Sequence, residues 1–219
     1  MFIGHYALGF AAKKAVPAVS LGALFAACQL ADLLWPTLVL LGVESFKVMP
    51  GATVVTPLVF TSYPYSHGLL PLVAWGALFG LGYMLITRSK VTAAITIALL
   101  VVSHWVLDYI VHVPDMPLAP GVPDKFGLGL WNSLWGTIGV ELGMFVVGVL
   151  VYLRMTKARD KVGLIGFWAL VVFLVGVYLA NLFGPPPPNV ATVALSAEAL
   201  WLVVLWGYWV DRHRFVRTL

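Results

Sequence analysis

The chain has 219 residues, of which 61% are hydrophobic and only 10% are charged. A soluble domain is about a quarter charged, and a soluble fold of this size cannot hide so much apolar surface in one core. The composition therefore excludes an ordinary soluble domain and indicates a protein that uses lipid as its solvent. The formal net charge of +4 comes from basic residues in short flanks between apolar runs. Such flanks are typical of membrane topology signals, so nucleic-acid binding is not expected.

Six apolar stretches are long enough to cross a bilayer, for which a helix needs about 20 residues. They are expected at residues 19–42, 67–87, 91–112, 130–154, 162–182 and 191–210. A shorter helical stretch, residues 4–15, precedes them and is too short to span alone. The sequence thus predicts an all-α, polytopic membrane helix bundle over residues 1–219. This single integral membrane domain would have six transmembrane helices and a short N-terminal half-helix.

The basic residues orient these spans. Eleven of the thirteen fall on one side, namely Lys13, Lys14, Arg88, Lys90, Arg154, Lys157, Arg159, Lys161, Arg212, Arg214 and Arg217. Only Lys47 and Lys125 fall on the other side. The positive-inside rule therefore predicts that both termini face the cytoplasm. The extracytoplasmic loops at 43–66 and 113–129 are long and contain prolines, so functional features are expected on the outer side.

Ionisable side chains lie inside the expected spans, where an unpartnered one is costly. They are Asp32, His104, Asp108, Glu141 and Glu198, with His67 and His112 at span ends. A rise of about 1.5 Å per helical residue places most of them between mid-membrane and the outer third of the bilayer. His5 belongs to the same layer if Lys13 and Lys14 mark the cytoplasmic surface, because a helix rising back from them puts His5 roughly 12–14 Å inside.

His104 and Asp108 are spaced i, i+4 and therefore share one face of their helix. An H-x-x-x-D pair lets an imidazole and a carboxylate hold one ion from successive turns. Neutral imidazole nitrogen and carboxylate oxygen suit zinc, and also manganese or iron. With His5, Asp32 and His67 at compatible depth, the pair predicts a divalent metal site whose ligands are these five residues.

Plainer interpretations exist for the same residues. Asp32 can serve as a hydrogen-bond partner for a neighbouring helix, and His104 with Asp108 can form an ion pair without a metal. His112 lies at the water boundary and is expected to be an ordinary interfacial residue. Glu141 can be a protonated structural carboxyl.

At these residues the sequence resembles the YdjM-type family of bacterial inner-membrane proteins, described as membrane-bound metal-dependent hydrolases. The matching features are Gly4-His5 with Gly9, then Asp32, then the Ser66-His67 pair, and then the H-x-x-x-D of His104 and Asp108. They cover roughly the first half of the chain. The family often carries a second acid beside the aspartate, where this chain has Leu30-Ala31-Asp32-Leu33-Leu34. The resemblance implies a multi-pass protein of the bacterial inner membrane.

A more distant analogy is with zinc-dependent phospholipase C enzymes, which order their ligands in a similar way. By that analogy Asp32, His67, His104 and Asp108 hold one metal ion and His5 helps to hold another. The resulting hypothesis is a hydrolase that cleaves a lipid or lipid-linked ester or phosphoester near the outer leaflet. Glu141 is its expected general base, with Glu198 as the second choice.

Two other functions fit the same residues. Buried carboxylates, histidines and a half-helix ending at mid-membrane are also features of transporters and proton relays. A non-catalytic subunit of a membrane complex could use the cluster as a structural metal site or hydrogen-bonded knot. Membrane lipid is the expected partner in each case. The sequence leaves the substrate, the number of metal ions and the oligomeric state open.

Overall fold

Helices dominate the structure, a computed structural model that describes residues 1–217. The helices are α1 (Ile3–Ala12), α2 (Leu21–Cys28), α3 (Leu30–Leu40), α4 (Leu69–Thr87), α5 (Val91–Val111), α6 (Leu134–Met155), α7 (Lys161–Phe183), α8 (Val190–Ala197) and α9 (Leu200–Arg212), with a 3₁₀ turn at Leu130–Asn132. Three short antiparallel pairs join β1 (Ser45–Val48) to β2 (Leu58–Ser62), β3 (Met116–Pro117) to β4 (Lys125–Phe126), and β5 (Thr156–Ala158) to β6 (Arg214–Val216).

The long helices can cross a membrane. Helices α4, α5, α6 and α7 and the segment Val190–Arg212, made of α8 and α9, are each long and apolar enough, and α2 with α3 forms a sixth, bent candidate. Large apolar side chains such as Ile86 and Val172 are exposed on the outside of these helices, as expected where lipid surrounds the bundle. The predicted all-α bundle with six spans and a short first helix is confirmed. The protein is a multi-pass membrane protein.

The first predicted span is not one straight helix. Helices α2 and α3 meet at a bend of 58°. Gln29, between them, has φ −107° and ψ 8°, which lies outside the helical region. The turn of helix on either side therefore loses the regular pattern of backbone hydrogen bonds, and the carbonyl of Cys28 is left for another partner.

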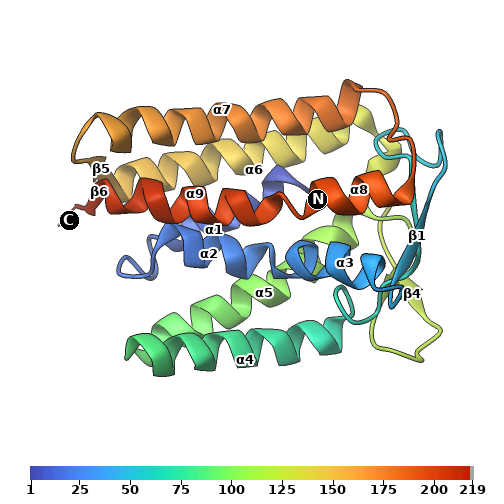
Figure 1. The fold of residues 1–219 in the computed structure, drawn as a ribbon, viewed down its shortest axis with the longest axis horizontal. Coiled ribbons are helices and arrows are strands. Elements are labelled where there is room, and N and C mark those ends of the chain that lie inside the picture. The colour runs from blue at the N-terminus through green and yellow to red at the C-terminus, as the bar shows by residue number, and fades with distance from the viewer. Residues whose placement is uncertain (218–219) are drawn as a thin grey trace.

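Helix α1 lies inside the bundle rather than on its edge (Figure 1). It packs against α6, where a Cβ atom added at Gly148 would lie 2.4 Å from the carbonyl oxygen of Ala7. Helices α4 and α5 approach equally closely, since a Cβ atom at Gly80 would lie 2.4 Å from the carbonyl oxygen of Ala94. Close backbone approach of this kind needs residues without a side chain.

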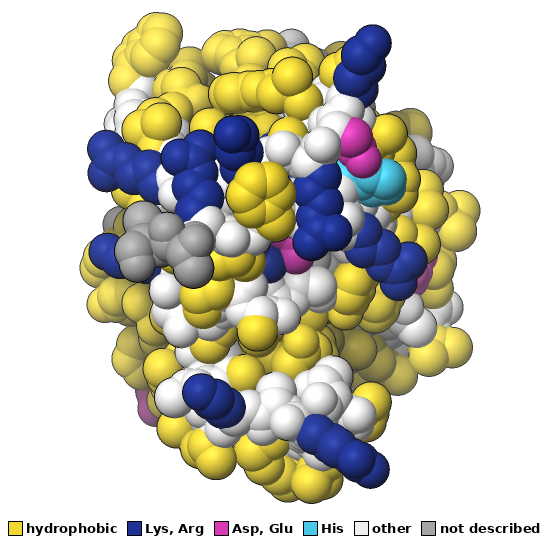
Figure 2. Space-filling view, turned by 90° about the vertical axis from the view of Figure 1, so that its left-hand side faces the viewer, with side chains coloured by type: hydrophobic (Ala, Val, Ile, Leu, Met, Phe, Trp, Pro, Cys, Tyr) yellow, Lys and Arg dark blue, Asp and Glu magenta, His cyan; other side chains and the backbone are white. Residues whose placement is uncertain are grey.

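The two ends of the bundle differ in charge. Figure 2 looks onto the end that holds β5, β6 and the last turn of α9, and shows Lys and Arg side chains over much of it. Beneath them, Nζ of Lys13 donates to Oδ2 of Asp211 at 2.6 Å, and the hydroxyl of Tyr152 donates to Oδ1 of the same carboxylate at 2.8 Å. The opposite end carries the hairpin β1–β2, the pair β3–β4 and the long loops (Figure 1).

Candidate metal centre

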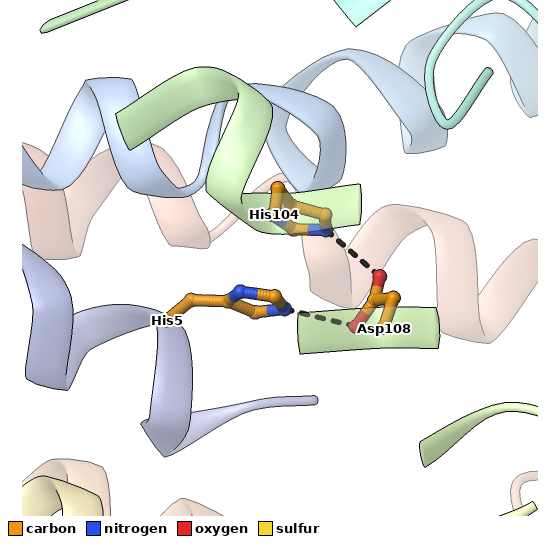
Figure 3. A group of neighbouring side chains, drawn as sticks. All are labelled: His5, His104 and Asp108. Atoms are coloured by element: carbon orange, nitrogen blue, oxygen red, sulfur yellow. Dashed lines mark hydrogen bonds and ion pairs between the residues drawn. The ribbon is translucent and has the colours of Figure 1, made fainter. Parts of the chain in front are cut away.

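The structure brings together all five residues predicted as metal ligands. His5 comes from α1, Asp32 from α3, His104 and Asp108 from α5, and His67 from the segment just before α4. Figure 3 shows His5, His104 and Asp108 pointing toward one another. His5, His104 and Asp108 form one group with ligand atoms within 4.8 Å of each other, and Asp32, His67 and His104 form a second. The two groups share His104.

Two histidine nitrogens each lie within 4 Å of two carboxylate oxygens. Nε2 of His104 lies 3.1 Å from Oδ2 of Asp108 and 3.8 Å from Oδ1 of Asp32. Nε2 of His67 lies 3.4 Å from Oδ1 of Asp32 and 3.8 Å from Oδ2 of Asp108. Ligands about 2.0–2.1 Å from a tetrahedral zinc ion are about 3.3 Å from one another. The four distances lie on both sides of this value, so each histidine–carboxylate pair is close enough to share one ion, although Asp32 and Asp108 belong to different groups.

A hydrogen bond on the side of the ring away from the cluster fixes the orientation of His104. Its Nδ1 lies 2.9 Å from the carbonyl oxygen of Cys28, which the bend between α2 and α3 leaves free. A carbonyl only accepts, so Nδ1 carries a proton, and in the neutral ring Nε2 presents its lone pair. Nε2 is buried and no donor within residues 1–217 reaches it with hydrogen-bond geometry. Buried acceptors normally have a hydrogen-bond donor, so a buried histidine nitrogen that lacks one is a candidate metal ligand.

His5 meets the other side of Asp108. Its Nε2 lies 3.1 Å from Oδ1 of Asp108, and its ring stacks on that of His104 with centroids 3.7 Å apart. The amino group of Met1 also contacts Oδ1. Asp108 therefore directs Oδ2 toward His67 and His104 and Oδ1 toward His5. His5 is placed to support this carboxylate or to bind a second ion.

Glu141, the predicted general base, is a residue of α6 whose carboxylate contacts the start of α1. Its Oε2 accepts from the backbone N–H of Phe2 at 2.8 Å and of Gly4 at 3.3 Å. It thereby satisfies N–H groups that the first turn of a helix leaves free and places negative charge at the positive end of its dipole. Glu198, the second choice, is not among the residues that line the cavity at the cluster, and its Oε1 accepts from the hydroxyl of Thr37 at 2.6 Å.

His112 is not the interfacial residue that the sequence predicts. It is buried, with Nδ1 2.9 Å from Oδ1 of Asp115 and Nε2 3.9 Å from Oδ2 of Asp108. Asp115 also accepts from the hydroxyl of Tyr63 at 2.8 Å. Burial, together with the charge of Asp115, raises the pKa of Tyr63 well above its usual value, so this hydroxyl stays a donor. The only sequence sign of this arrangement is that His112 follows Asp108 by one helical turn.

A cavity of about 610 Å³ connects the cluster to the loop end. Its inner wall carries Asp32, His67, Asp108, His112 and Glu141, and its outer lining includes the exposed Pro50, Val54 and Pro185. Asp32 is the most open of the predicted ligands in this wall, with 26% of its side chain exposed. Asp32 is therefore the candidate ligand most accessible from the cavity.

The ligand distances, the supporting hydrogen bonds and the cavity described above are all features of this one chain. Neither a family model, nor a curated protein, nor a solved structure matches it.

Proposed function

We propose that this protein is a membrane-embedded, metal-dependent hydrolase. Its substrate would be a lipid or lipid-linked ester or phosphoester at the outer leaflet of a bacterial inner membrane, and its family the YdjM type that the first half resembles. One observation carries the proposal. Two histidine nitrogens each lie 3.1–3.8 Å from two carboxylate oxygens, close enough for the pairs to share an ion, at the inner end of a cavity.

Zinc is the proposed ion, with manganese and iron as alternatives, because imidazole and carboxylate donors suit all three. Bound at Asp32, His67, His104 and Asp108, such an ion supplies Lewis-acid activation of water and of a carbonyl or phosphoryl oxygen. The openness of Asp32 to the cavity leaves room on that side for a water molecule and a substrate oxygen.

Proton transfer belongs to the residues beside the cluster. Glu141 lines the cavity, and its carboxylate retains lone pairs beyond those used by the N–H groups of α1. We assign it the role of general base. His112 also lines the cavity, and Asp115 orients its ring from behind, in the manner of a base held by a third group.

A lipid-like substrate fits the walls of the cavity. Val177 and Leu182 of α7, Val193 of α8 and Leu200 of α9 provide apolar surface at the loop end of two membrane-spanning segments. Within residues 1–217, no Lys or Arg lines the cavity, so no basic side chain is there to bind a highly charged soluble substrate. The basic end of the bundle would face the cytoplasm with both termini, which puts the cavity at the outer leaflet.

Elemental analysis and lipid hydrolysis test the proposal. The detergent-purified protein should contain zinc, manganese or iron in stoichiometric amount, and it should release product from phospholipid or acyl-ester vesicles only when that metal is present. The variants Asp32→Asn and Asp108→Asn should lose both properties. Stoichiometric metal in the double variant would overturn the metal centre. Solute flux into proteoliposomes that needs Asp32 but no metal would establish the transporter instead.

A further inference from the structure

Glu44 is a buried carboxylate in the outer loop that precedes β1, and the proposed reaction has no direct use for it. It is 2% exposed. Its Oε1 accepts from the backbone N–H of Tyr65 at 2.8 Å and of Ser66 at 2.9 Å, and its Oε2 accepts from the hydroxyl of Ser66 at 2.6 Å. The carboxylate is therefore held in one orientation by three donors.

These bonds determine the direction of the next one. Oγ of Ser66 also lies 2.7 Å from Nδ1 of His67. A hydroxyl has one proton, and the Ser66 hydroxyl gives it to Glu44, because an ionised carboxylate can only accept. Oγ must then accept from His67, so Nδ1 of His67 carries the proton. The Nε2 of a neutral His67 is left as a lone pair that faces Asp32 and Asp108.

His67 and His104 are thus held in the same tautomer by hydrogen bonds to separate parts of the chain. A backbone carbonyl holds Nδ1–H of His104, and the Glu44–Ser66 pair holds Nδ1–H of His67. Both rings then present Nε2 to the same point. Partners of this kind fix the tautomer of a metal-binding histidine and raise its basicity.

We propose that Glu44 is a positioning residue that acts through Ser66 to hold His67 in the tautomer that binds the metal ion. This inference rests on the proposed metal centre. It also assigns a role to the outer loop, since Glu44 precedes the hairpin β1–β2 and Ser66 follows it.

The variant Glu44→Gln tests the direction of the hydrogen bonds that run from His67 through Ser66 to Glu44, because glutamine has nearly the same shape as glutamate. Two backbone N–H groups hold the Oε1 position, so the glutamine carbonyl must stay there and its NH₂ group must face Ser66. That group donates, and the Ser66 hydroxyl must then turn and donate to Nδ1 of His67. The proton of the neutral imidazole moves to Nε2, which no longer binds a metal. Zinc affinity should fall about 10- to 100-fold.

Two readouts besides activity measure this change. Competition with a chromophoric chelator gives the zinc dissociation constant, and ¹⁵N NMR of histidine-labelled protein gives the tautomer of His67. The wild type should show Nδ1–H, and Glu44→Gln should show Nε2–H. Ser66→Ala should also weaken zinc binding, while Ser66→Thr, which keeps the hydroxyl, should retain it. Ser62→Ala, at an exposed position of the same hairpin, is the control.

The outcomes separate this inference from the proposed function. If the wild type binds zinc and Glu44→Gln binds it equally well with the tautomer unchanged, the positioning role is overturned and the metal centre stands. If the wild type binds no metal, the proposed function fails. An Nε2–H tautomer in the metal-free wild type overturns the positioning role independently of zinc. If Glu44→Gln does not fold, the comparison of Ser66→Ala with Ser66→Thr decides.

Discussion

Nε2 of His104 and Oδ2 of Asp108 lie 3.1 Å apart on successive turns of α5. They are close enough for a hydrogen bond, yet the two groups are not aligned for one. The lone pair of the nitrogen and the charge of the oxygen both face the interior of the cluster. Two acceptors in such a position repel each other unless a proton or a metal ion lies between them, and the metal ion gives the first prediction.

His104→Gln should weaken zinc binding at least as much as the roughly 10- to 100-fold typical of losing an outer-shell partner. Glutamine has an N–H group to offer to the carbonyl of Cys28, so the loss should reflect the missing ligand rather than an unsatisfied backbone. Metal titration of the purified protein measures it. His213→Gln, at the exposed basic end, is the control and should bind zinc like the wild type. Equal affinity in both variants would remove His104 from the ligand set.

Gly80→Ala should destabilise the contact between α4 and α5. The added Cβ would lie 2.4 Å from the carbonyl oxygen of Ala94, and overpacking of this kind costs about 1–3 kcal/mol. Gly82→Ala on the same helix is the matched control, because no other part of residues 1–217 lies within 4 Å of its Cβ position. Unfolding in detergent should show a lower melting temperature for the first variant only. Equal melting temperatures would mean that α4 and α5 can move apart to accommodate the added methyl group without loss of stability.

Lys13→Met should destabilise the protein by about 3–5 kcal/mol, the usual cost of removing one partner of a buried ion pair. It leaves Asp211, 12% exposed, without its cation. Lys14→Met is the control, since Lys14 is exposed next to it in the chain. The free energy of unfolding from denaturant titration measures both variants. Lys13→Met with Asp211→Asn should recover part of the loss, and a double variant worse than the single one would contradict the pairing.

Asp160 gives a pH-dependent prediction at the basic end. A hydrogen bond from His213, with further bonds from backbone N–H groups at the start of α7, holds the pKa of Asp160 below its ordinary value. A carboxyl whose pKa is lowered by folding stabilises the fold above its unfolded pKa of about 3.9 and loses that contribution as the pH falls through its folded pKa.

Asp160→Asn should therefore lower the melting temperature at pH 5–7, and the difference from wild type should shrink below about pH 4. Asparagine caps a helix as well as aspartate does, so the comparison isolates the charge. Thermal unfolding between pH 3 and pH 7 measures the effect. Asp124→Asn, on an exposed outer loop, should show no such pattern. A difference that stays constant down to pH 3 would contradict the pairing with His213.

Hydropathy and charge predicted most of the fold, because lipid imposes simple rules on length and composition. The half-helix and the convergence of His5, Asp32 and His104 followed from depth along each span. The bend at Gln29 did not, since neither a proline nor a glycine marks it. The sequence alone does not tell which glycines lie at helix contacts. Gly80 touches a neighbouring helix, whereas Gly143 has no other part of residues 1–217 within 4 Å of its Cβ position.

The groups that support the cluster were harder to predict than its ligands. Glu44 and Ser66 are 22 residues apart and meet only because the hairpin β1–β2 returns the chain. His112 lies at the end of a span, which suggests contact with water, but the loop after α5 folds back and buries it. Such contacts depend on how loops pack in three dimensions, and periodicity and depth carry no information about that.

The bend between α2 and α3 also constrains how the protein is assembled. A carbonyl that no longer pairs within its own helix is expensive in a hydrocarbon interior, and the donor for Cys28 comes from a residue 76 positions later in the chain. The first span can therefore settle into its bent form only after α5 has been made and inserted beside it. The imidazole that satisfies the backbone at the bend is also the one that faces the cluster, so the bent first span and the arrangement of the cluster depend on the same contact.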